Sequence, residues 1–174
     1  MTDALNVSET YTYYNNGNLK DKTDRLGYKT TTTYNHLNQP LKVTNTKDGS
    51  GKAVTYTYTY DAAGRLTTES ETGGSITISK TYTYNKDHHR TKMVVKKDAA
   101  TVQTTNYTYD SAGRLLTVND GSATPPTATY AYDANGNRIS QTLWNGVITE
   151  YEYNKANLLT KLTNKQNSTT NYSV

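Results

Sequence analysis

Polar and apolar residues alternate along most of the chain with a period of two. In residues 55–60 every second residue is a tyrosine and the intervening residues are threonines. Such alternation is typical of a β-strand whose two faces meet different surroundings. Residues 76–84, 107–109, 130–132 and 147–153 continue this pattern, and no window combines helical periodicity with a capping residue. The pattern therefore predicts an all-β fold.

The clearest alternating strand runs into a turn sequence, and this combination recurs along the chain. Its best example is the stretch Tyr58-Thr59-Tyr60-Asp61-Ala62-Ala63-Gly64-Arg65-Leu66. Counted by the second tyrosine, the same frame fits seven positions, which are Tyr13, Tyr34, Tyr60, Tyr84, Tyr109, Tyr132 and Tyr153. By subtraction, successive copies lie 21, 26, 24, 25, 23 and 21 residues apart. A period of this size indicates a repeat array.

About 24 residues hold two strands of ordinary length and two reversals. We therefore predict a meander of antiparallel β-hairpins, about seven repeats and about 14 strands, in which residues 1–174 form a single array. Residues 164–174 are a polar tail or the start of a further repeat at Tyr172. Loops are expected at residues 47–51 and 120–126, and Asn145-Gly146 is the strongest signal for a two-residue hairpin turn.

The turn residues follow the backbone conformation that a hairpin needs. Asp61 can accept backbone N–H bonds with its carboxylate, which favours a type I turn over Ala62 and Ala63. The fourth position then becomes left-handed, which glycine tolerates without steric cost. The other copies have Tyr14, Asn35, Asn85, Asp110, Asp133 and Asn154 at the first position. At the fourth position they have Gly17, Asn38, His88, Gly113, Gly136 and Asn157.

These substitutions favour a turn-forming role over the chemistry of a site. Asparagine replaces aspartate in sister copies while the rest of the pattern is kept, and glycine, asparagine and histidine all tolerate positive φ. A metal-binding or catalytic carboxylate would not be exchanged in this way. We therefore predict a set of structural turn residues, which includes Asp61, Gly64, Asp110, Gly113, Asp133, Gly136, Asn35 and Asn38.

The composition changes the expected core. Hydrophobic residues make up 33% of the chain, against a usual apolar share of about 45–50%. The mean hydropathy is −0.88, and the chain has 17 tyrosines and no phenylalanine. A thin layer of tyrosine faces is therefore expected in place of a thick aliphatic core. The strand-like alternation of tyrosine and β-branched residues argues against disorder.

Charge and cysteine content exclude several classes of protein. The net charge is +4, but the basic residues are scattered among acids, so we expect no nucleic-acid site. The absence of cysteine excludes disulfides, thiolate metal ligands and cysteine nucleophiles. No stretch approaches the roughly 18 apolar residues of a membrane span. No signal pattern opens the chain, so the export signal of a secreted parent would lie outside these residues.

We expect no catalytic, cofactor-binding or metal-binding residues. His36, His88 and His89 fall in turns, and the serines lack a nucleophile-elbow context. The tyrosines are expected to stack as cross-strand ladders. The alternative is a carbohydrate-binding or adhesion module, in which exposed tyrosines and Trp144 would contact the glycan.

The motif Tyr-x-Tyr-Asp-x-x-Gly-Arg-Leu, with its copy Tyr132-Asp133-Ala134-Asn135-Gly136-Asn137-Arg138, resembles the YD-repeat, or RHS-repeat, family. The resemblance covers all seven copies, from about Tyr11 to Leu162. Members of this family are bacterial secreted or surface polymorphic toxins, toxin-complex subunits and teneurins. The resemblance implies a continuous curved or spiralling sheet of β-hairpins, part of a shell or an open barrel, around or next to a C-terminal toxin or cargo domain.

The resemblance also implies a non-catalytic fragment of a protein that lies outside the bacterial cell or on its surface. Flanking YD repeats and the cargo domain would be its partners, and glycan binding has been proposed for some members. Open sheet edges predict homo-oligomers or strand exchange. The family's self-cleaving region carries Asp-Pro motifs, whereas Pro40, Pro125 and Pro126 follow no aspartate. No cleavage site, plug or toxin domain is therefore assigned to this chain.

Overall fold

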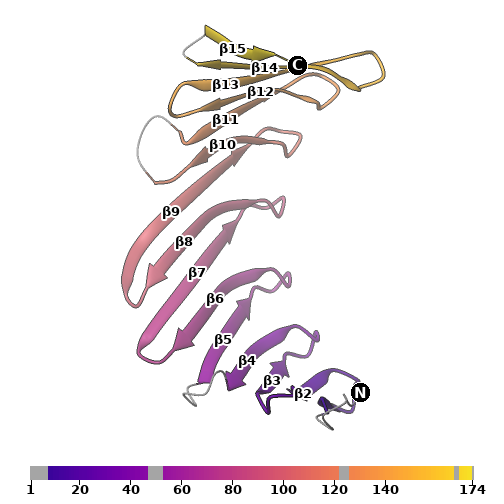
Figure 1. Cartoon of the computed structure of the whole chain (residues 1–174), viewed down its shortest axis with the longest axis vertical. Helices are drawn as coiled ribbons and strands as arrows, with labels where there is room; N and C mark the ends of the chain where they lie inside the picture. Colours follow the sequence, from indigo (N-terminus) through magenta and orange to yellow (C-terminus); the bar gives the residue numbers. More distant parts are fainter. Residues whose placement is uncertain (1–7, 47–52, 122–125, 167–168, 174) are drawn as a thin grey trace. The chain divides into compact units, whose positions relative to one another are not determined.

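The computed structural model describes residues 8–46, 53–121, 126–166 and 169–173, and the regular structure within these ranges is β-strand (Figure 1). The strands are β1 (Thr10–Tyr13), β2 (Leu19–Thr23), β3 (Lys29–Tyr34), β4 (Pro40–Thr46), β5 (Ala53–Tyr60), β6 (Leu66–Gly73), β7 (Ile76–Tyr84), β8 (Arg90–Lys97), β9 (Ala100–Tyr109), β10 (Leu115–Asn119), β11 (Ala128–Tyr132), β12 (Arg138–Leu143), β13 (Val147–Tyr153), β14 (Leu159–Gln166) and β15 (Thr169–Ser173).

The strands follow one another in the sheet in chain order, from β1 to β15. Within each part of the chain the paired neighbours run antiparallel, as in β5–β6 and β13–β14. The predicted all-β meander of antiparallel hairpins is confirmed. The sheet has 15 strands where about 14 were expected, because β15 pairs with β14 in the segment predicted to be a tail or a new repeat.

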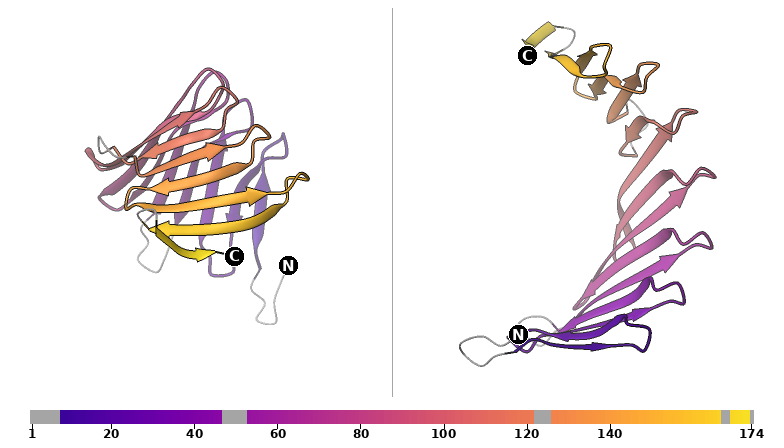
Figure 2. Two further views of the ribbon diagram at one scale, coloured as in Figure 1. Left: turned by 90° about the horizontal axis from the view of Figure 1, so that it is seen from above. Right: turned by 90° about the vertical axis from the view of Figure 1, so that its right-hand side faces the viewer.

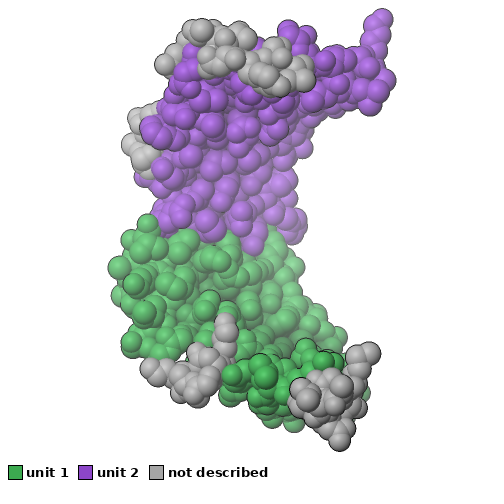
Figure 3. Space-filling model, viewed as in Figure 1, with its two compact units in different colours: residues 1–82, 94–102 green, residues 83–93, 103–174 purple. Residues whose placement is uncertain are grey.

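The chain divides into two compact units (Figure 3). Unit 1 contains residues 1–82 and 94–102, and unit 2 contains residues 83–93 and 103–174. The boundary passes through β7, β8 and β9. In each unit the strands form a single layer with no second layer of structure packed on it (Figure 2).

The sheet has two chemically different faces, as the pairing of β5 with β6 shows. Tyr56 and Tyr58 in β5 pair with Glu71 and Glu69 in β6, whereas Thr57 pairs with Ser70. Ladder partners share a face, so the tyrosines and glutamates lie together and the hydroxyl residues lie on the opposite side. We call the face that carries the repeat tyrosines the tyrosine face, and its opposite the threonine face.

A register shift marks the start of six of the return strands. Tyr60 pairs with Leu66 while Thr59 pairs with Thr68, which leaves Thr67 as an extra residue. The same shift occurs beside Tyr13, Tyr34, Tyr109, Tyr132 and Tyr153. A β-bulge of this kind bends the strand and increases its twist. The bulge is therefore a regular part of the repeat.

The core is as thin as the composition predicts. Among the described residues, Ala128 is the buried hydrophobic residue, at 5% exposure, and no large side chain is fully buried. Tyr56, Tyr58 and Tyr60 are half-buried, while Thr57 and Thr59 are exposed. Half-buried tyrosines therefore replace an aliphatic core, because each ring can cover its neighbours while its hydroxyl stays near water.

The loops include one departure from the sequence prediction. The Asn145-Gly146 turn has three residues, because β12 ends at Leu143 and β13 begins at Val147. The N–H of Gly146 donates to the carbonyl of Leu143 at 3.0 Å, and Gly146 has a φ of 80°. A turn followed by a left-handed glycine is the usual three-residue hairpin. The predicted loop at 47–51 lies outside the described ranges, as do residues 122–125 of the predicted loop at 120–126.

Candidate functional site: the repeat turns

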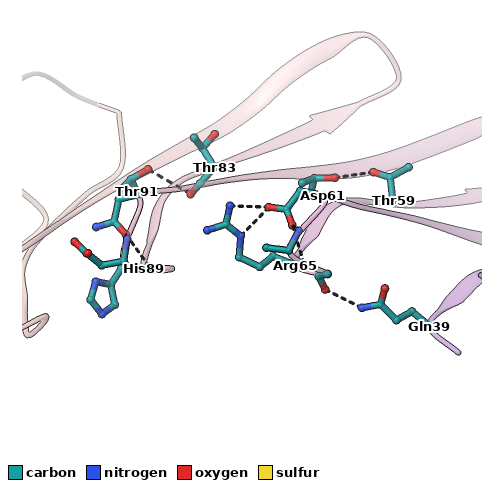
Figure 4. Close-up of polar contacts among 12 residues, drawn as sticks. Gln39, Thr59, Asp61, Arg65, Thr83, His89 and Thr91 are labelled. Atoms are coloured by element: carbon teal, nitrogen blue, oxygen red, sulfur yellow. Dashed lines mark hydrogen bonds and ion pairs between the residues drawn. The ribbon is translucent and has the colours of Figure 1, made fainter. Parts of the chain in front are cut away.

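One carboxylate organises the turn between β5 and β6. Oδ1 of Asp61 accepts hydrogen bonds from the backbone N–H groups of Ala63 (2.9 Å) and Arg65 (3.0 Å). The backbone closes the turn with bonds from Gly64 N to Asp61 O (3.0 Å) and from Asp61 N to Arg65 O (2.9 Å). Oδ2 of Asp61 accepts Nε of Arg65 at 2.7 Å and forms an ion pair with Nη2 at 2.7 Å (Figure 4).

The other repeat turns use the same bonds. The first-position side chain accepts N–H bonds from the second and fourth following residues in the turns that begin at Asn35, Asn85, Asp110 and Asn154. The turn at Tyr14 keeps both backbone bonds, and there Oδ1 of Asn16 accepts the N–H of Asn18 at 3.2 Å. Asp24 forms the full set between β2 and β3. The Asx-led sequence therefore makes this turn at both ends of the strands.

The fourth position of all seven repeat turns is left-handed. Its φ lies between 60° and 90° at Gly17, Asn38, Gly64, His88, Gly113, Gly136 and Asn157. A hairpin returns with the correct twist only if this residue takes that conformation. Glycine, asparagine and histidine at this position thus share one backbone requirement.

The second tyrosine of a repeat ties its hairpin to the preceding hairpin. The hydroxyl of Tyr60 donates to the carbonyl of Pro40 at 2.8 Å. The same bond joins Tyr34 to Leu19 (3.0 Å), Tyr109 to Arg90 (2.8 Å), Tyr132 to Leu115 (2.9 Å) and Tyr153 to Arg138 (3.1 Å). Each acceptor is the first residue of a return strand. We call this contact the tyrosine tie.

The residue after the fourth position connects one turn to the next. Nε2 of Gln39 donates to the carbonyl of Gly64 at 2.7 Å, and Nη1 of Arg114 donates to that of Asp133 at 3.0 Å. Two asparagine pairs do the same, from Asn18 to Asn38 and from Asn137 to Asn157, each at 2.8 Å. Within each unit these bonds join consecutive turns, and we call the joined turns the turn row.

His89 occupies the same position and connects turns by packing. Its ring stacks on Tyr109 with centroids 4.8 Å apart and an angle of 23° between the planes. The ring also covers Gly113, where an added Cβ would lie 2.7 Å from Cε1 of His89. Gly113 therefore has two reasons to be glycine, its φ of 79° and the ring above it.

The turn bonds also set the charge state of the aspartates. The backbone N–H of Arg65 is the main cause that lowers the pKa of Asp61 below its usual value, and the Arg65 side chain adds to it. Arg114 lowers the pKa of Asp110 in the same way. For Asp133 the side-chain amide of Asn137 is the main cause of the lowered pKa. Donors that bind the ionised form favour it, so these carboxylates act as permanent acceptors at neutral pH.

Cations of the chain itself lie over rings of the tyrosine face. The guanidinium carbon of Arg138 is 4.7 Å from the ring centroid of Tyr151 and 5.9 Å from that of Tyr130. Arg114 lies over Tyr132 at 4.8 Å. Further pairs are Arg90 with Tyr107 and Lys22 with Tyr11. These distances are within the range of cation–π attraction, so rings of the tyrosine face hold cations that the chain itself supplies.

Of the remaining candidates, Trp144 lies apart from the turn row and the histidines lie in repeat turns. Trp144 is 68% exposed in the β12–β13 turn, at the opposite end of β12 from the repeat turn at Asp133. The histidines His36, His88 and His89 stand in repeat turns. In the part of the chain that the structure describes, no three potential metal ligands come together. Nor do those residues contain a helix of the length and apolarity that crossing a membrane requires.

The geometry thus defines an antiparallel β-hairpin repeat whose motif residues are engaged in turns and in contacts between repeats. Residues 42–76 and 132–169 match the RHS repeat family. The resemblance to this family that the sequence predicted is confirmed, and the two matched segments are RHS repeats. The sequence matches none of the curated proteins with which it was compared.

Several solved structures share the fold. The Tc holotoxin pore of Photorhabdus luminescens is 21% identical, with a TM-score of 0.76, and the match covers 96% of this chain and 9% of that chain. The TcdB2–TccC3 crystal structure is 21% identical, with a TM-score of 0.76 and coverage of 95% and 10%. TcdB2–TccC3 without its hypervariable C-terminal region is 19% identical, with a TM-score of 0.76 and coverage of 95% and 9%. The chain therefore spans about a tenth of the structures it resembles.

Proposed function

We propose that the chain is a non-catalytic structural module, a segment of a shell or scaffold around or next to a toxin or other cargo domain. The observation that carries this proposal is the use of the motif residues. Asp61 and its counterparts hold turns, and Tyr60 and its counterparts form tyrosine ties. The recurring polar groups of each repeat thus form its turn and its contacts with the neighbouring repeat.

The enclosure of a cargo domain is the finer part of the proposal. It is supported by the shared fold with TcdB2–TccC3, one structure of which is described without a hypervariable C-terminal region. The single-layer sheet, with half-buried tyrosines, leaves a broad face available to a neighbour. A parent protein of this kind would lie outside the bacterial cell or on its surface, and flanking RHS repeats would continue the sheet.

Limited proteolysis of the parent protein tests enclosure. Two forms of the parent protein are purified. The first is complete, and the second keeps the C-terminal region but lacks the repeats that flank this chain. We expect the C-terminal region of the complete protein to resist protease until denaturant opens the repeats. Equal cleavage rates in the two proteins, at matched protease concentration, would contradict enclosure while leaving the structural role of the turns intact.

Edge pairing is a consequence of an array with a strand at each edge. The strand β1 lies at one edge of the sheet, and a free edge offers unpaired backbone groups to another strand. We expect the isolated chain to form homo-oligomers or to exchange strands. Sedimentation at several concentrations tests this, and a well-folded monomer throughout would contradict it.

A second candidate function is glycan binding, and the observation in its favour is the exposed indole of Trp144. Aromatic faces suit stacking against sugar rings because they are broad and apolar. A glycan array with the chain and with a Trp144→Ala variant tests this function. Binding that the variant loses would support it, and an array without hits, or equal binding by the variant, would end it.

A further inference from the structure

Two neighbouring rows of the tyrosine face in unit 1 have the same design but differ at one residue. Tyr58 in β5, Glu69 in β6 and Lys80 in β7 are ladder partners and form the first row. Tyr56, Glu71 and Ile78 form the second row on the same three strands. The two rows therefore present an aromatic ring and a carboxylate at matching places, followed by a cation in one row and an aliphatic side chain in the other.

The first row is complete. Nζ of Lys80 lies 2.7 Å from Oε1 of Glu69, and the hydroxyl of Tyr82 donates to the same oxygen at 3.0 Å. These bonds lower the pKa of Glu69, with the Lys80 bond as the main cause. A carboxylate beside a tyrosine ring is thus neutralised by a lysine from the next strand.

The second row lacks this cation. Ile78 stands where the first row has its lysine, and Glu71 forms no ion pair or hydrogen bond within residues 53–121. Lys80 does not compensate for it, because its amine is bound to Glu69. Glu71 therefore presents an unpaired charge between the ring of Tyr56 and the methyl groups of Ile78.

The two rows enclose a cleft of about 230 Å³, and its lining includes Tyr56, Glu71 and Ile78. The cleft also contains Lys80, but its amine is paired with Glu69, so one of the two carboxylates in the lining, Glu71, has no cation, and a lysine or arginine side chain would supply it. Its aliphatic stem can pack on Ile78, and its charged end can meet the Glu71 carboxylate and the face of Tyr56. The chain gives precedents on the same face, because Lys22 lies 5.6 Å from the ring centroid of Tyr11.

We propose that this cleft binds a lysine or arginine side chain on an extended segment of the enclosed cargo domain. The source of that segment rests on the proposed function, whereas the cation site itself does not. The net charge of +4 makes unspecific attraction of a basic peptide unfavourable. Binding would therefore depend on the local row of Tyr56, Glu71 and Ile78.

The test uses the 174-residue chain and a short extended peptide with one central arginine, followed by NMR titration at low salt. A peptide with citrulline in place of arginine keeps the shape and removes the charge. We expect the arginine peptide to shift signals of Tyr56, Glu71 and Ile78. The citrulline peptide and the Glu71→Gln variant are expected to bind about three- to tenfold more weakly, which is the range of an exposed ion pair with a cation–π contact.

Matched variants make the result decisive. Ile78→Lys supplies the missing cation from within the chain and is expected to abolish peptide binding while the fold is kept, since it copies the first row. Asp87→Asn removes one negative charge from an exposed turn in unit 2 and is expected to change nothing. Equal binding of the citrulline peptide, or unchanged binding by both Glu71→Gln and Ile78→Lys, would overturn the cation site. Failure of the protease-protection experiment would remove only the cargo as its source.

Discussion

At the scale of single residues, the repeat motif determines the backbone conformation of the turn. Asp61 accepts the N–H groups that a five-residue loop leaves unpaired, and Gly64 supplies the left-handed residue. The aspartate can be exchanged for asparagine because both present Oδ1 in the same place, as Asn35 and Asn154 do. What aspartate adds is a charge, and that charge makes the turn sensitive to acid.

The acid sensitivity gives a first prediction. The pKa values of Asp61, Asp110 and Asp133 are lowered in the folded chain. A lowered folded-state pKa contributes stability above the unfolded value, and this contribution is lost as the pH falls through the folded value. We expect the free energy of unfolding to decrease below about pH 4. In a variant with asparagine at these three positions the decrease is expected to be smaller, as measured by urea unfolding from pH 7 to pH 2.

The design of that comparison relies on turns already present in the chain. Asn35, Asn85 and Asn154 show that asparagine holds the same turn, so the variant is expected to fold at pH 7. Glu69 and Asp21 also have lowered pKa values and keep part of the acid response in both proteins. Identical pH profiles for the two proteins would contradict the assignment of acid sensitivity to the turn aspartates.

Two turn glycines give a second prediction at this scale. An alanine at Gly64 meets an ordinary contact, 3.5 Å from Nε2 of Gln39, whereas at Gly113 its Cβ would clash with the His89 ring. We expect Gly64→Ala to lower the free energy of unfolding by about 1–2 kcal/mol, because alanine is strained in the left-handed conformation, and Gly113→Ala to lower it further. Urea unfolding of both variants measures the difference. The excess is expected to disappear when His89→Ala is combined with Gly113→Ala, and a persistent excess would contradict the role of the ring.

At the scale of elements, the hairpin is joined to its neighbours by contacts that the hydrophobic pattern does not encode. Strands, turns and the tyrosine face follow from alternation and from the Asx-led sequence, so they could be predicted. The bulge at Thr67 could not, because an extra residue leaves the alternating pattern readable on both sides. Leu41 and Ile139 are the extra bulge residues of their own repeats, and they are exposed at 39% and 38%, although simple alternation would place them among the buried positions.

The contacts between turns could not be predicted either, for a different reason. Gln39, Arg114 and Asn137 have unlike side chains, and only the geometry shows that each reaches the next turn. A signal was present in the alignment of the copies, since the residue after the fourth position is polar in every copy until Leu158. The partners of the tyrosine hydroxyls could not be predicted either. They are backbone carbonyls, which every residue has, so the sequence does not distinguish the acceptor.

The turn row gives a prediction for Arg114. This side chain pairs with Asp110 at 2.6 Å, donates to the carbonyl of Asp133 and covers the ring of Tyr132. We expect Arg114→Ala to lower the free energy of unfolding by about 1–3 kcal/mol, since it removes a charge-assisted bond and ring packing together. Leu158 holds the same position in the seventh turn and is 63% exposed. Leu158→Ala is expected to stay within about 0.5 kcal/mol, and equal effects of the two variants would contradict the turn row.

At the scale of the whole molecule, stability comes from repetition, because no compact core is present in the described residues. Each hairpin contacts the hairpins beside it, so the free energy of unfolding is a sum of contributions from hairpins and from the contacts between them. Repeat arrays of this kind gain stability with length and present extended surfaces. Both properties suit a shell or scaffold. The proposed site for a basic side chain lies on the tyrosine face of this extended surface.

The most direct measurement of this account removes tyrosine ties and nothing else. Tyr60→Phe combined with Tyr132→Phe deletes one tie in each unit and keeps both rings. We expect the free energy of unfolding to fall by about 1–3 kcal/mol for the two hydrogen bonds. The matched control, Tyr58→Phe combined with Tyr130→Phe, alters the first tyrosines of the same strands and is expected to change stability by less than about 0.5 kcal/mol. Equal stability of the two variants would contradict the claim that the second tyrosine joins each repeat to the one before it.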